Sequence, residues 1–192
     1  MILKVDLEKA YDRLEWSFVR SMLVSLGFQS DTVELILSCI FTTSASLLFN
    51  GSQIGEIFPS CGLRQGDLIS PYIFILYMEF SSTLINLKCE EGSWKKIKAS
   101  RSGPGFSHIF FFADDLLLFA KIDESNIEAL VEVLDEFCKL TSLKISKEKS
   151  KIFFSPNVTT EEKGEIVNQT GIGETHNLGK YLGFPIIHKG RR

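Results

Sequence analysis

The sequence predicts an α+β fold whose sheet is largely antiparallel, and three observations indicate this class. Strand-like and helical patterns mix along the chain without the strict βαβ alternation of parallel sheets. Two strand-like runs are joined through Asn50-Gly51, the strongest short-range signal for a β-hairpin. The run from residue 107 to 120 is apolar enough for two buried strands, with Asp114 and Asp115 at the turn between them.

The remaining elements follow from local patterns. A short strand is expected at residues 1–7, before a helix at 15–27 whose apolar side chains recur at helical spacing and stop at Gly27, a good C-cap. Further helices are expected at residues 31–41, about 70–87, 123–141 and 159–169, and further single strands at 94–99, 150–155 and 180–186. Asp123 or Ser125 can serve as the N-cap of the helix at 123–141.

The bulk composition is that of a globular protein. A chain of 192 residues suits one domain, and 44% hydrophobic with 23% charged residues is enough to form a core. The net charge is −3 and the pI is near 5.7, so no basic footprint for nucleic acid is visible. This balance disfavours a complete polymerase, whose template-primer cleft should be positive.

The cysteines and the apolar runs exclude several other classes. The four cysteines lie far apart and form no CxxC pair, so we expect reduced core thiols of an intracellular protein, in nucleus or cytoplasm, rather than a zinc site or a disulfide framework. They are Cys39, Cys61, Cys89 and Cys138. The most apolar stretch, "YIFILYMEF", is too short to span a bilayer and is interrupted by Glu79, so no membrane partner is expected.

Three aspartates stand on apolar strands. Asp114 and Asp115 are adjacent in an apolar run, where burying a charge costs several kcal/mol unless something compensates it. A metal ion is the simplest compensation, and Asp6, on another apolar strand, would provide a further hard oxygen ligand. Adjacent acids also occur in solvated turns, and these residues alone do not decide between the two interpretations.

Five sequence blocks decide between a metal site and a solvated turn. They are "LKVDLEKAYDRLEW", "GLRQGDLISPYIF", "FFADDLLLF", "SLKISKEKSKIFFS" and "KYLGFPI". In this order and spacing the chain resembles reverse transcriptases, most closely those of LINE-type (non-LTR) retrotransposons, particularly plant ones. The resemblance covers residues 2 to about 187, and five ordered blocks make it highly specific.

The resemblance implies the palm of an RNA-directed DNA polymerase, a mainly antiparallel sheet backed by helices that occupies residues 1–192. A primer 3′-hydroxyl would attack the α-phosphate of a deoxynucleoside triphosphate (dNTP), with two Mg²⁺ ions, or alternatively Mn²⁺, neutralising the oxygens. The implied metal ligands are Asp6, Asp114, Asp115 and the backbone carbonyl of Leu7. The implied partners are an RNA template, a DNA primer and the fingers and thumb of the parent polyprotein.

The resemblance also assigns roles around the incoming nucleotide. Tyr11, five residues after Asp6, would fill the space that a 2′-hydroxyl needs, although a plain core tyrosine is the alternative. Gln65 and Gly66 would approach the nucleotide and the templating base, glycine allowing close backbone contact. Arg64 would support this loop through Asp67. The same stretch can also be a polar loop that caps the following helix, and the two interpretations are compatible.

Two further blocks concern the leaving group and the primer. Lys149 matches the lysine thought to protonate the departing pyrophosphate, because an ammonium near a phosphate is both general acid and point charge. Neighbouring lysines make a solvated basic face the alternative. Tyr181, Leu182 and Gly183 match the primer-positioning hairpin.

The sequence departs from the family pattern in three respects. Leu68 stands where the family usually has a proline, which fixes φ, so the loop geometry is open to question. The first metal aspartate is already residue 6, and we expect fingers and thumb to be largely missing, so that the chain is truncated at both ends. The alternative to a catalytic palm is therefore a non-catalytic retrotransposon remnant. A metal-dependent phosphohydrolase would leave "RQGD" and "YLG" unexplained.

Overall fold

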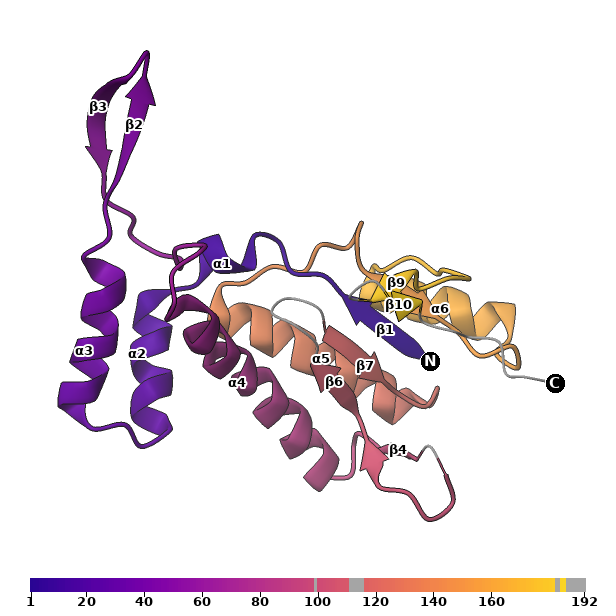
Figure 1. Cartoon of the computed structure of the whole chain (residues 1–192). Helices are drawn as coiled ribbons and strands as arrows, with labels where there is room; N and C mark the ends of the chain where they lie inside the picture. Colours follow the sequence, from indigo (N-terminus) through magenta and orange to yellow (C-terminus); the bar gives the residue numbers. More distant parts are fainter. Residues whose placement is uncertain (99, 111–115, 182–183, 186–192) are drawn as a thin grey trace. The chain divides into compact units, whose positions relative to one another are not determined.

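The computed structural model describes residues 1–98, 100–110, 116–181 and 184–185 (Figure 1). The chain forms two compact units. The first comprises Met1–Glu8, Ser81–Cys138 and Lys144–Arg192, and the second comprises Lys9–Phe80 and Lys139–Leu143. This division leaves the prediction of one partial palm domain untested.

The first unit is built on a four-stranded antiparallel sheet in the order β6-β7-β1-β8. The strands are β1 (Ile2–Val5), β6 (His108–Phe110), β7 (Leu116–Phe119) and β8 (Lys151–Phe153). The register pairs Val5 with Leu116 and Lys4 with Lys151. The predicted α+β class with a largely antiparallel sheet is confirmed.

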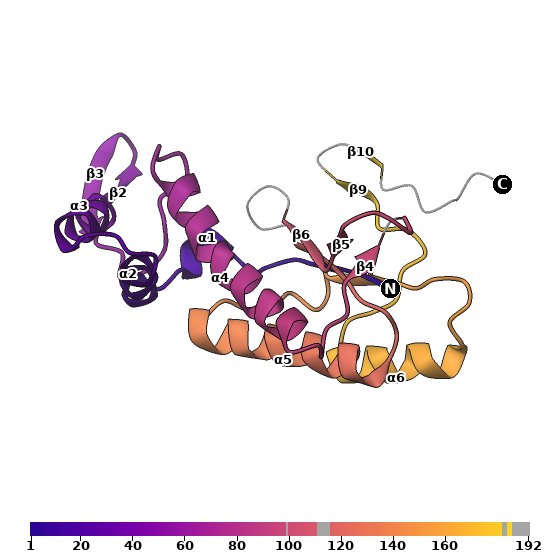
Figure 2. The same cartoon turned by 90° about the horizontal axis from the view of Figure 1, so that it is seen from below.

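One face of this sheet is buried. Along β1, Leu3 and Val5 are fully buried and alternate with partly exposed Ile2 and Lys4, as the period of two in a strand requires. Helices α5 (Glu124–Thr141) and α6 (Thr160–Thr170) run along one side of the strands (Figure 2). A capping box formed by Thr159 and Glu162 begins α6.

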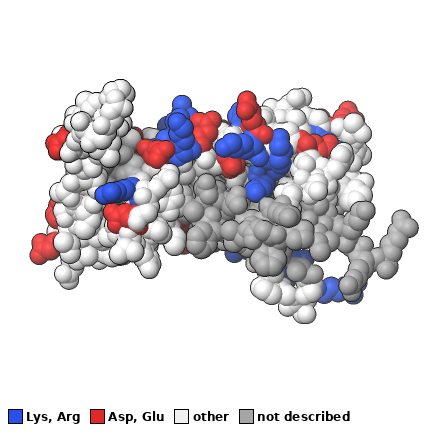
Figure 3. Space-filling view, turned by 45° about the horizontal axis from the view of Figure 1, so that its top comes forward, with Lys and Arg blue, Asp and Glu red and all other residues white. Residues whose placement is uncertain are grey.

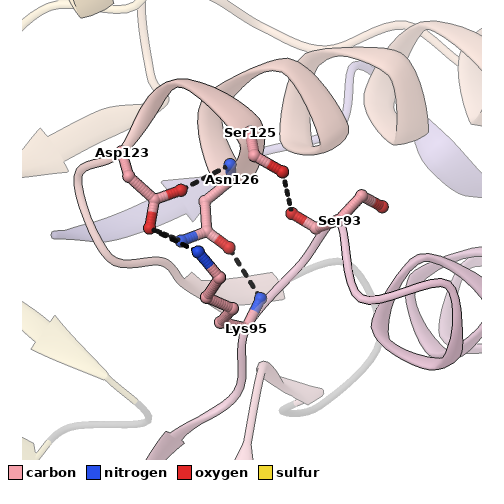
Figure 4. A network of polar contacts seen from close by, with 5 residues as sticks. All are labelled: Ser93, Lys95, Asp123, Ser125 and Asn126. Carbon is pink, nitrogen blue, oxygen red and sulfur yellow. Dashed lines mark hydrogen bonds and ion pairs between the residues drawn. The ribbon is translucent and has the colours of Figure 1, made fainter.

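The start of α5 is fixed by a polar network (Figure 4). Asp123 is the residue that caps the helix, since its carboxylate accepts hydrogen bonds from the backbone N–H (3.0 Å) and the side-chain amide (2.8 Å) of Asn126. The buried Asn126 in turn accepts from the Lys95 backbone N–H at 2.6 Å. Ser125 instead donates to the Ser93 carbonyl at 2.9 Å, so one of the two predicted caps is confirmed.

Two small hairpins complete the first unit. Strand β4 (Ile97–Lys98) pairs with β5 (Gly105–Phe106), which confirms the short strand predicted near residue 97. The prediction of a single strand at 180–186 is wrong, whereas the antiparallel pairing agrees with the hairpin that the resemblance implies. Strands β9 (Lys180–Tyr181) and β10 (Phe184–Pro185) pair antiparallel with each other.

The second unit is mainly helical. It contains α1 (Ala10–Arg13), α2 (Trp16–Ser25), α3 (Ser30–Phe41) and the first half of α4 (Ser70–Glu90). Gly27, with φ of 85°, follows α2 as predicted. Phe18 packs edge-on against Tyr77 and Phe80 of α4, with ring centroids 4.9 and 5.1 Å apart.

The hairpin of β2 (Ala45–Phe49) and β3 (Ser52–Ile57) extends away from α2 and α3 (Figure 1). Asn50 and Gly51 have φ of 49° and 81°, the positive values that a two-residue hairpin turn needs, and the predicted turn is confirmed. Its apolar residues are largely exposed, Leu48 at 77%.

The cysteines are only partly as expected. All four lie in the described part of the chain and are free thiols, but Cys39 is exposed and the other three are half-buried. The prediction of core thiols is therefore wrong, because the residues at these positions do not face the core. No helix in the described part combines the length and apolar character that crossing a membrane requires.

Candidate functional site

Asp6 directly follows β1, and backbone contacts hold it on two sides. Its backbone N–H donates to the hydroxyl of the buried Ser150 at 3.0 Å, and its carbonyl accepts from the Ser146 N–H at 2.9 Å. The bond to Ser146 belongs to the isolated bridge of Leu7 with Ile145, beyond the end of β1 at Val5. The sheet therefore fixes the Asp6 backbone, and the carboxylate stands at the end of a buried strand.

The Asp6 carboxylate lies beside the predicted general acid. Its Oδ1 atom is shielded from solvent, although the side chain as a whole is 28% exposed. The ammonium nitrogen of Lys149 is 3.9 Å from Oδ1, and the Lys149 side chain is 73% exposed. An ion pair this exposed adds little stability. The Lys149 ammonium therefore lies next to the Asp6 carboxylate and is accessible to a ligand from solvent.

The neighbouring lysines are mostly exposed to solvent. Lys144, Lys147 and Lys149 are exposed and Lys151 is half-buried. On the face shown in Figure 3, Lys and Arg side chains are interleaved with Asp and Glu. This matches the small negative net charge of −3.

The pairing of Leu7 with Ile145 does not use the backbone carbonyl of Leu7. Leu7 forms an isolated antiparallel bridge with Ile145, and the hydrogen bonds flank this pair. Glu8 N–H donates to the Lys144 carbonyl, and the Asp6 carbonyl accepts from the other side of the bridge. In such a pair the central carbonyl points away from the partner segment, so the Leu7 oxygen is turned to the opposite side.

Several predicted site residues lie outside the described part of the chain. They are Asp114, Asp115, Leu182 and Gly183. Tyr181 belongs to β9, and its backbone pairs with Phe184. Among the described residues no group of three or more His, Cys, Asp or Glu side chains could hold a metal ion. Asp6 is the predicted metal ligand whose side chain the structure describes.

The predicted nucleotide residues line a cavity of about 510 Å³ in the second unit. Tyr11, Gln65 and Gly66 lie on its wall, with five further residues from the loop and the start of α4: Asp67, Leu68, Ser70, Pro71 and Tyr72. The half-buried Tyr11 ring stacks on the fully buried Phe74 ring of α4, with centroids 4.6 Å apart and planes 13° from parallel. Tyr11 is therefore a cavity wall with a fixed ring rather than a core residue.

Three hydrogen bonds tie the segment before this loop to α1 and α2. Leu63 N–H donates to the Tyr11 carbonyl, Gly62 N–H donates to the Leu14 carbonyl, and the Trp16 indole N–H donates to the Gly62 carbonyl, each at 2.7 Å. The segment thus runs alongside α1, which brings Gln65 and Gly66 to Tyr11.

Arg64 is arranged differently from the prediction. It lines a second cavity of about 470 Å³ with Asp12 and the base of the β2–β3 hairpin. Its guanidinium makes no ion pair with Asp67 within the described residues; the Asp67 N–H donates to the Arg64 carbonyl at 3.4 Å. The Asp67 carboxylate instead accepts from the Ile69 N–H, two residues further on and just before α4, as in an Asx turn.

Sequence reasoning missed the supporting residues. Trp16 was expected only as an apolar helix residue, and Gly62 and Phe74 only as parts of a block. Ser150, which holds Asp6, carried no signal of its own, because its role depends on a contact across 144 positions. The tryptophan itself is the available signal at Trp16, since an indole N–H that is shielded from water needs an acceptor.

Comparison with known proteins supports one family. The family described as "Reverse transcriptase (RNA-dependent DNA polymerase)" matches residues 1–186. An uncharacterized mitochondrial protein of Arabidopsis thaliana is 44% identical over 68 residues, 35% of this chain and 55% of its own length. The retrovirus-related Pol polyprotein from the type-2 retrotransposable element R2DM of Drosophila melanogaster is 28% identical over 148 residues, 77% of this chain and 13% of its own length.

A further relative and two solved structures agree with this. The Pol polyprotein from a type-1 retrotransposable element R2 of Popillia japonica is 27% identical over 150 residues, covering 78% of this chain and 20% of that protein. A Candida albicans telomerase structure superposes with a TM-score of 0.59 at 16% identity, covering 83% of this chain and 27% of that one. A Candida tropicalis apo telomerase gives 0.56 at 14%, covering 74% and 28%. These structures show the fold alone, and the chain spans 13 to 55% of the relatives' lengths.

Proposed function

Because this chain belongs to the reverse transcriptase family of RNA-directed DNA polymerases, we propose that it forms a catalytic palm that transfers nucleotides from dNTPs to a primer 3′-hydroxyl. The resemblance to non-LTR retrotransposon enzymes agrees with its relatives among R2 Pol polyproteins. The proposal concerns the chemistry of this region, with an RNA template and a DNA primer as partners.

The observation that carries the proposal is the register of β1 and β7. Val5 pairs with Leu116, Asp6 follows Val5, and Asp115 directly precedes Leu116 in the sequence. Neighbouring strands lie about 4.8 Å apart, so Val5 and Leu116, the sequence neighbours of Asp6 and Asp115, lie side by side in the sheet. Two-metal sites need compact carboxylates, with metal ions about 3.5–4 Å apart.

The donors fit Mg²⁺, with Mn²⁺ as the alternative. Asp6 offers a carboxylate whose Oδ1 is shielded from solvent, and Leu7 offers a carbonyl not used by its bridge to Ile145. Both are hard oxygen ligands of the kind that Mg²⁺ prefers. Asp6, Asp114, Asp115 and the Leu7 carbonyl would hold the ions. When bound, the ions would neutralise the phosphate oxygens during transfer.

Lys149 would hold a proton for the leaving group. Its ammonium is 3.9 Å from Asp6 Oδ1, and it is exposed enough to meet a triphosphate. The carboxylate beside it would keep it oriented in the absence of substrate. As the pyrophosphate departs, Lys149 would donate a proton to its oxygen and interact with the negative charge.

The cavity in the second unit would receive the incoming nucleotide. Tyr11, with its ring held against Phe74, would exclude a 2′-hydroxyl, and Gln65 and Gly66 would contact the nucleotide from the loop. Arg64, which lines the neighbouring cavity, would support nucleotide binding from there. Tyr181, Leu182 and Gly183 would position the primer end, as the antiparallel pairing of β9 with β10 supports.

The alternative is a non-catalytic retrotransposon remnant with the same fold. The interleaved charges and the net charge of −3 favour it for the chain alone, since holding template-primer depends on cationic contacts to the phosphates. Under the catalytic proposal, fingers and thumb of a longer polyprotein would supply those contacts. A test must therefore compare the chain with and without such segments.

The experiment measures extension of a DNA primer on an RNA template with Mg²⁺. One arm uses the 192-residue chain, and the other a chimera that carries it between the flanking segments of the R2DM polyprotein. We expect weak Mg²⁺ binding and little or no extension by the chain, and template-directed extension by the chimera. A folded chimera that extends nothing would favour the remnant, and robust extension by the chain alone would refute the need for flanking segments.

A further inference from the structure

We propose that Trp16 and Gly62 are positioning residues for the incoming nucleotide. Their hydrogen bonds hold residues 62–63 against α1 and so fix residues 65–66 beside Tyr11. The proposal rests on the proposed function and goes beyond it, since neither residue lines the cavity of about 510 Å³. We call the three hydrogen bonds among Tyr11, Leu14, Trp16, Gly62 and Leu63 the latch.

The latch needs glycine at position 62. Gly62 has φ of +87°, a conformation that side-chain-bearing residues rarely adopt. A Cβ there would lie 2.8 Å from the Asp12 carbonyl oxygen and 3.0 Å from its carbonyl carbon, both of them backbone atoms that cannot swing aside. The close approach is therefore specific to glycine, and it brings the Gly62 backbone within hydrogen-bonding distance of Leu14.

Trp16 closes the latch from the other side. Its indole N–H donates to the Gly62 carbonyl at 2.7 Å, and its ring lies 4.8 Å from the Phe41 ring, centroid to centroid. The Phe41 contact leaves the ring in place when the N–H is removed. A phenylalanine at position 16 would thus keep most of the packing and lose the hydrogen bond.

Tyr11 takes part in both the latch and the cavity. Its carbonyl accepts from Leu63 N–H, while its ring, stacked on Phe74, lines the cavity with Gln65 and Gly66. Gln65 is two residues beyond Leu63, so the spacing between the ring and the loop is set by a short, hydrogen-bonded piece of backbone. Weakening the latch should widen this spacing without removing any group that touches the nucleotide.

The chain offers a matched control. Trp94, fully buried in the first unit, also donates its indole N–H to a backbone carbonyl, that of Phe119, at 3.1 Å. Trp16→Phe and Trp94→Phe therefore delete the same kind of hydrogen bond in different units. Cys61 provides a second readout, because its thiol lies 3.5 Å from the Asp12 carbonyl oxygen inside the latched segment.

The experiment measures binding of dTTP with Mg²⁺ to the 192-residue chain by saturation-transfer difference NMR, which suits weak ligands. The proteins are wild type, Trp16→Phe, Trp94→Phe and Tyr11→Ala. We expect Trp16→Phe to raise the dTTP Kd about 3- to 10-fold, as loss of one hydrogen bond predicts, and Trp94→Phe to leave it unchanged. Alkylation of Cys61, relative to the exposed Cys39, should be faster in Trp16→Phe only.

The outcomes separate the latch from the proposed function. Unchanged dTTP binding and Cys61 alkylation in Trp16→Phe, with binding lost in Tyr11→Ala, would overturn the latch and leave the nucleotide cavity standing. If wild type binds no dTTP, or Tyr11→Ala binds it as wild type does, the cavity is not the nucleotide site and both proposals fail. An equal loss of binding in Trp16→Phe and Trp94→Phe would show a general effect on stability and also overturn the latch.

Discussion

The end of β1 and the loop at residues 61–66 position their functional groups in different ways. Asp6 continues a strand that pairs with β7 on one side and β8 on the other, so its place is set by two registers and by the Ser150 hydroxyl. Among the described residues the loop pairs with no strand, and it is held by the latch at Gly62 together with the contact of the Cys61 thiol to the Asp12 carbonyl. The carboxylate therefore has redundant support, whereas the loop depends on single residues.

This difference predicts where the molecule is sensitive. A change near Asp6 loses one of many contacts in a sheet, and the rest of the ladder remains. A change at the latch removes a large share of what holds the loop. Substitution of the loop glycines Gly62 and Gly66 therefore tests this difference most strictly, because the two glycines have different surroundings.

Gly62→Ala is expected to have the largest effect on stability. Gly62 and Gly66 have φ of +87° and +88°, so alanine is strained at both, at about 1–2 kcal/mol. Only at Gly62 would the new Cβ meet backbone, 2.8 Å from the Asp12 oxygen, which adds about 1–3 kcal/mol. Urea unfolding should show Gly62→Ala to be the less stable variant. Equal losses for the two would contradict the close approach of residue 62 to α1.

Tyr11→Ala tests whether the Tyr11 ring, beside the loop, selects the sugar of the incoming nucleotide. Removing the ring should admit ribonucleotides and change the ribo-to-deoxyribonucleotide preference about 10- to 100-fold, the range that one group in a pocket can supply. Single-nucleotide primer extension by the R2DM chimera measures this preference, with Tyr72→Ala, further along the same cavity, as a comparison. An unchanged preference in Tyr11→Ala would refute the steric role.

Leu68→Pro is expected to increase the stability of the chain slightly. The Leu68 side chain is 89% exposed, its φ is not positive, and within the described residues its backbone N–H donates no hydrogen bond. Proline there should stabilise the chain by about 0.4–1 kcal/mol by restricting the unfolded state. Thermal unfolding measures this, and a marked fall in Tm would mean that the loop does not have the family geometry.

The smallest effect is expected on the sheet side, at His108 of β6. Its ring contacts the hydroxyls of Ser107 (3.0 Å) and Ser82 (3.3 Å), and burial, with the nearby positive charge of Lys96, lowers its pKa. The fold thus favours the neutral ring, while the unfolded chain takes up a proton below about pH 6.5. The free energy of unfolding should therefore fall as the pH drops through that value.

A His108→Gln variant checks the assignment. It should be less stable than wild type at pH 7.5 but lose less of its stability between pH 7.5 and 5.5, as measured by urea unfolding at both values. The same pH dependence in both proteins would exclude His108 as the source.

Much of the fold could be predicted because its signals are local. Local patterns predicted α2 to α6, Asn50-Gly51 predicted the hairpin turn, and Gly27 ended α2 where expected, whereas the one-turn helix α1 was not predicted. The pattern predicts one strand at 180–186 where the structure has two, because each strand is only two residues long and too short for a pattern of its own. The apolar residues of the sequence also do not distinguish the half-buried strand β1 from the exposed strand β2, because burial depends on what packs against a strand.

In the candidate site, the residues that line the cavity could be predicted from the sequence, whereas the residues that support them could not. Tyr11, Gln65 and Gly66 were predicted together and do line one cavity, because the family blocks record residues that touch a ligand. The contacts that hold them, from Trp16, Gly62 and Phe74, join positions far apart in the sequence. Arg64 was paired with Asp67 because they are close in sequence, but the Asp67 carboxylate is used by the start of α4.

Primer extension by the R2DM chimera carrying Asp6→Asn tests the central claim most directly. Asparagine keeps the size and the backbone bonds to Ser150 and Ser146 but removes the charge that a metal site needs. We predict a loss of RNA-templated extension on the order of 10³-fold, equivalent to several kcal/mol of transition-state stabilisation, with unchanged unfolding. Asp135→Asn, an exposed acid of α5, should extend as the parent does. Equal extension by Asp6→Asn and Asp135→Asn would contradict the claim that Asp6 is part of a catalytic metal site.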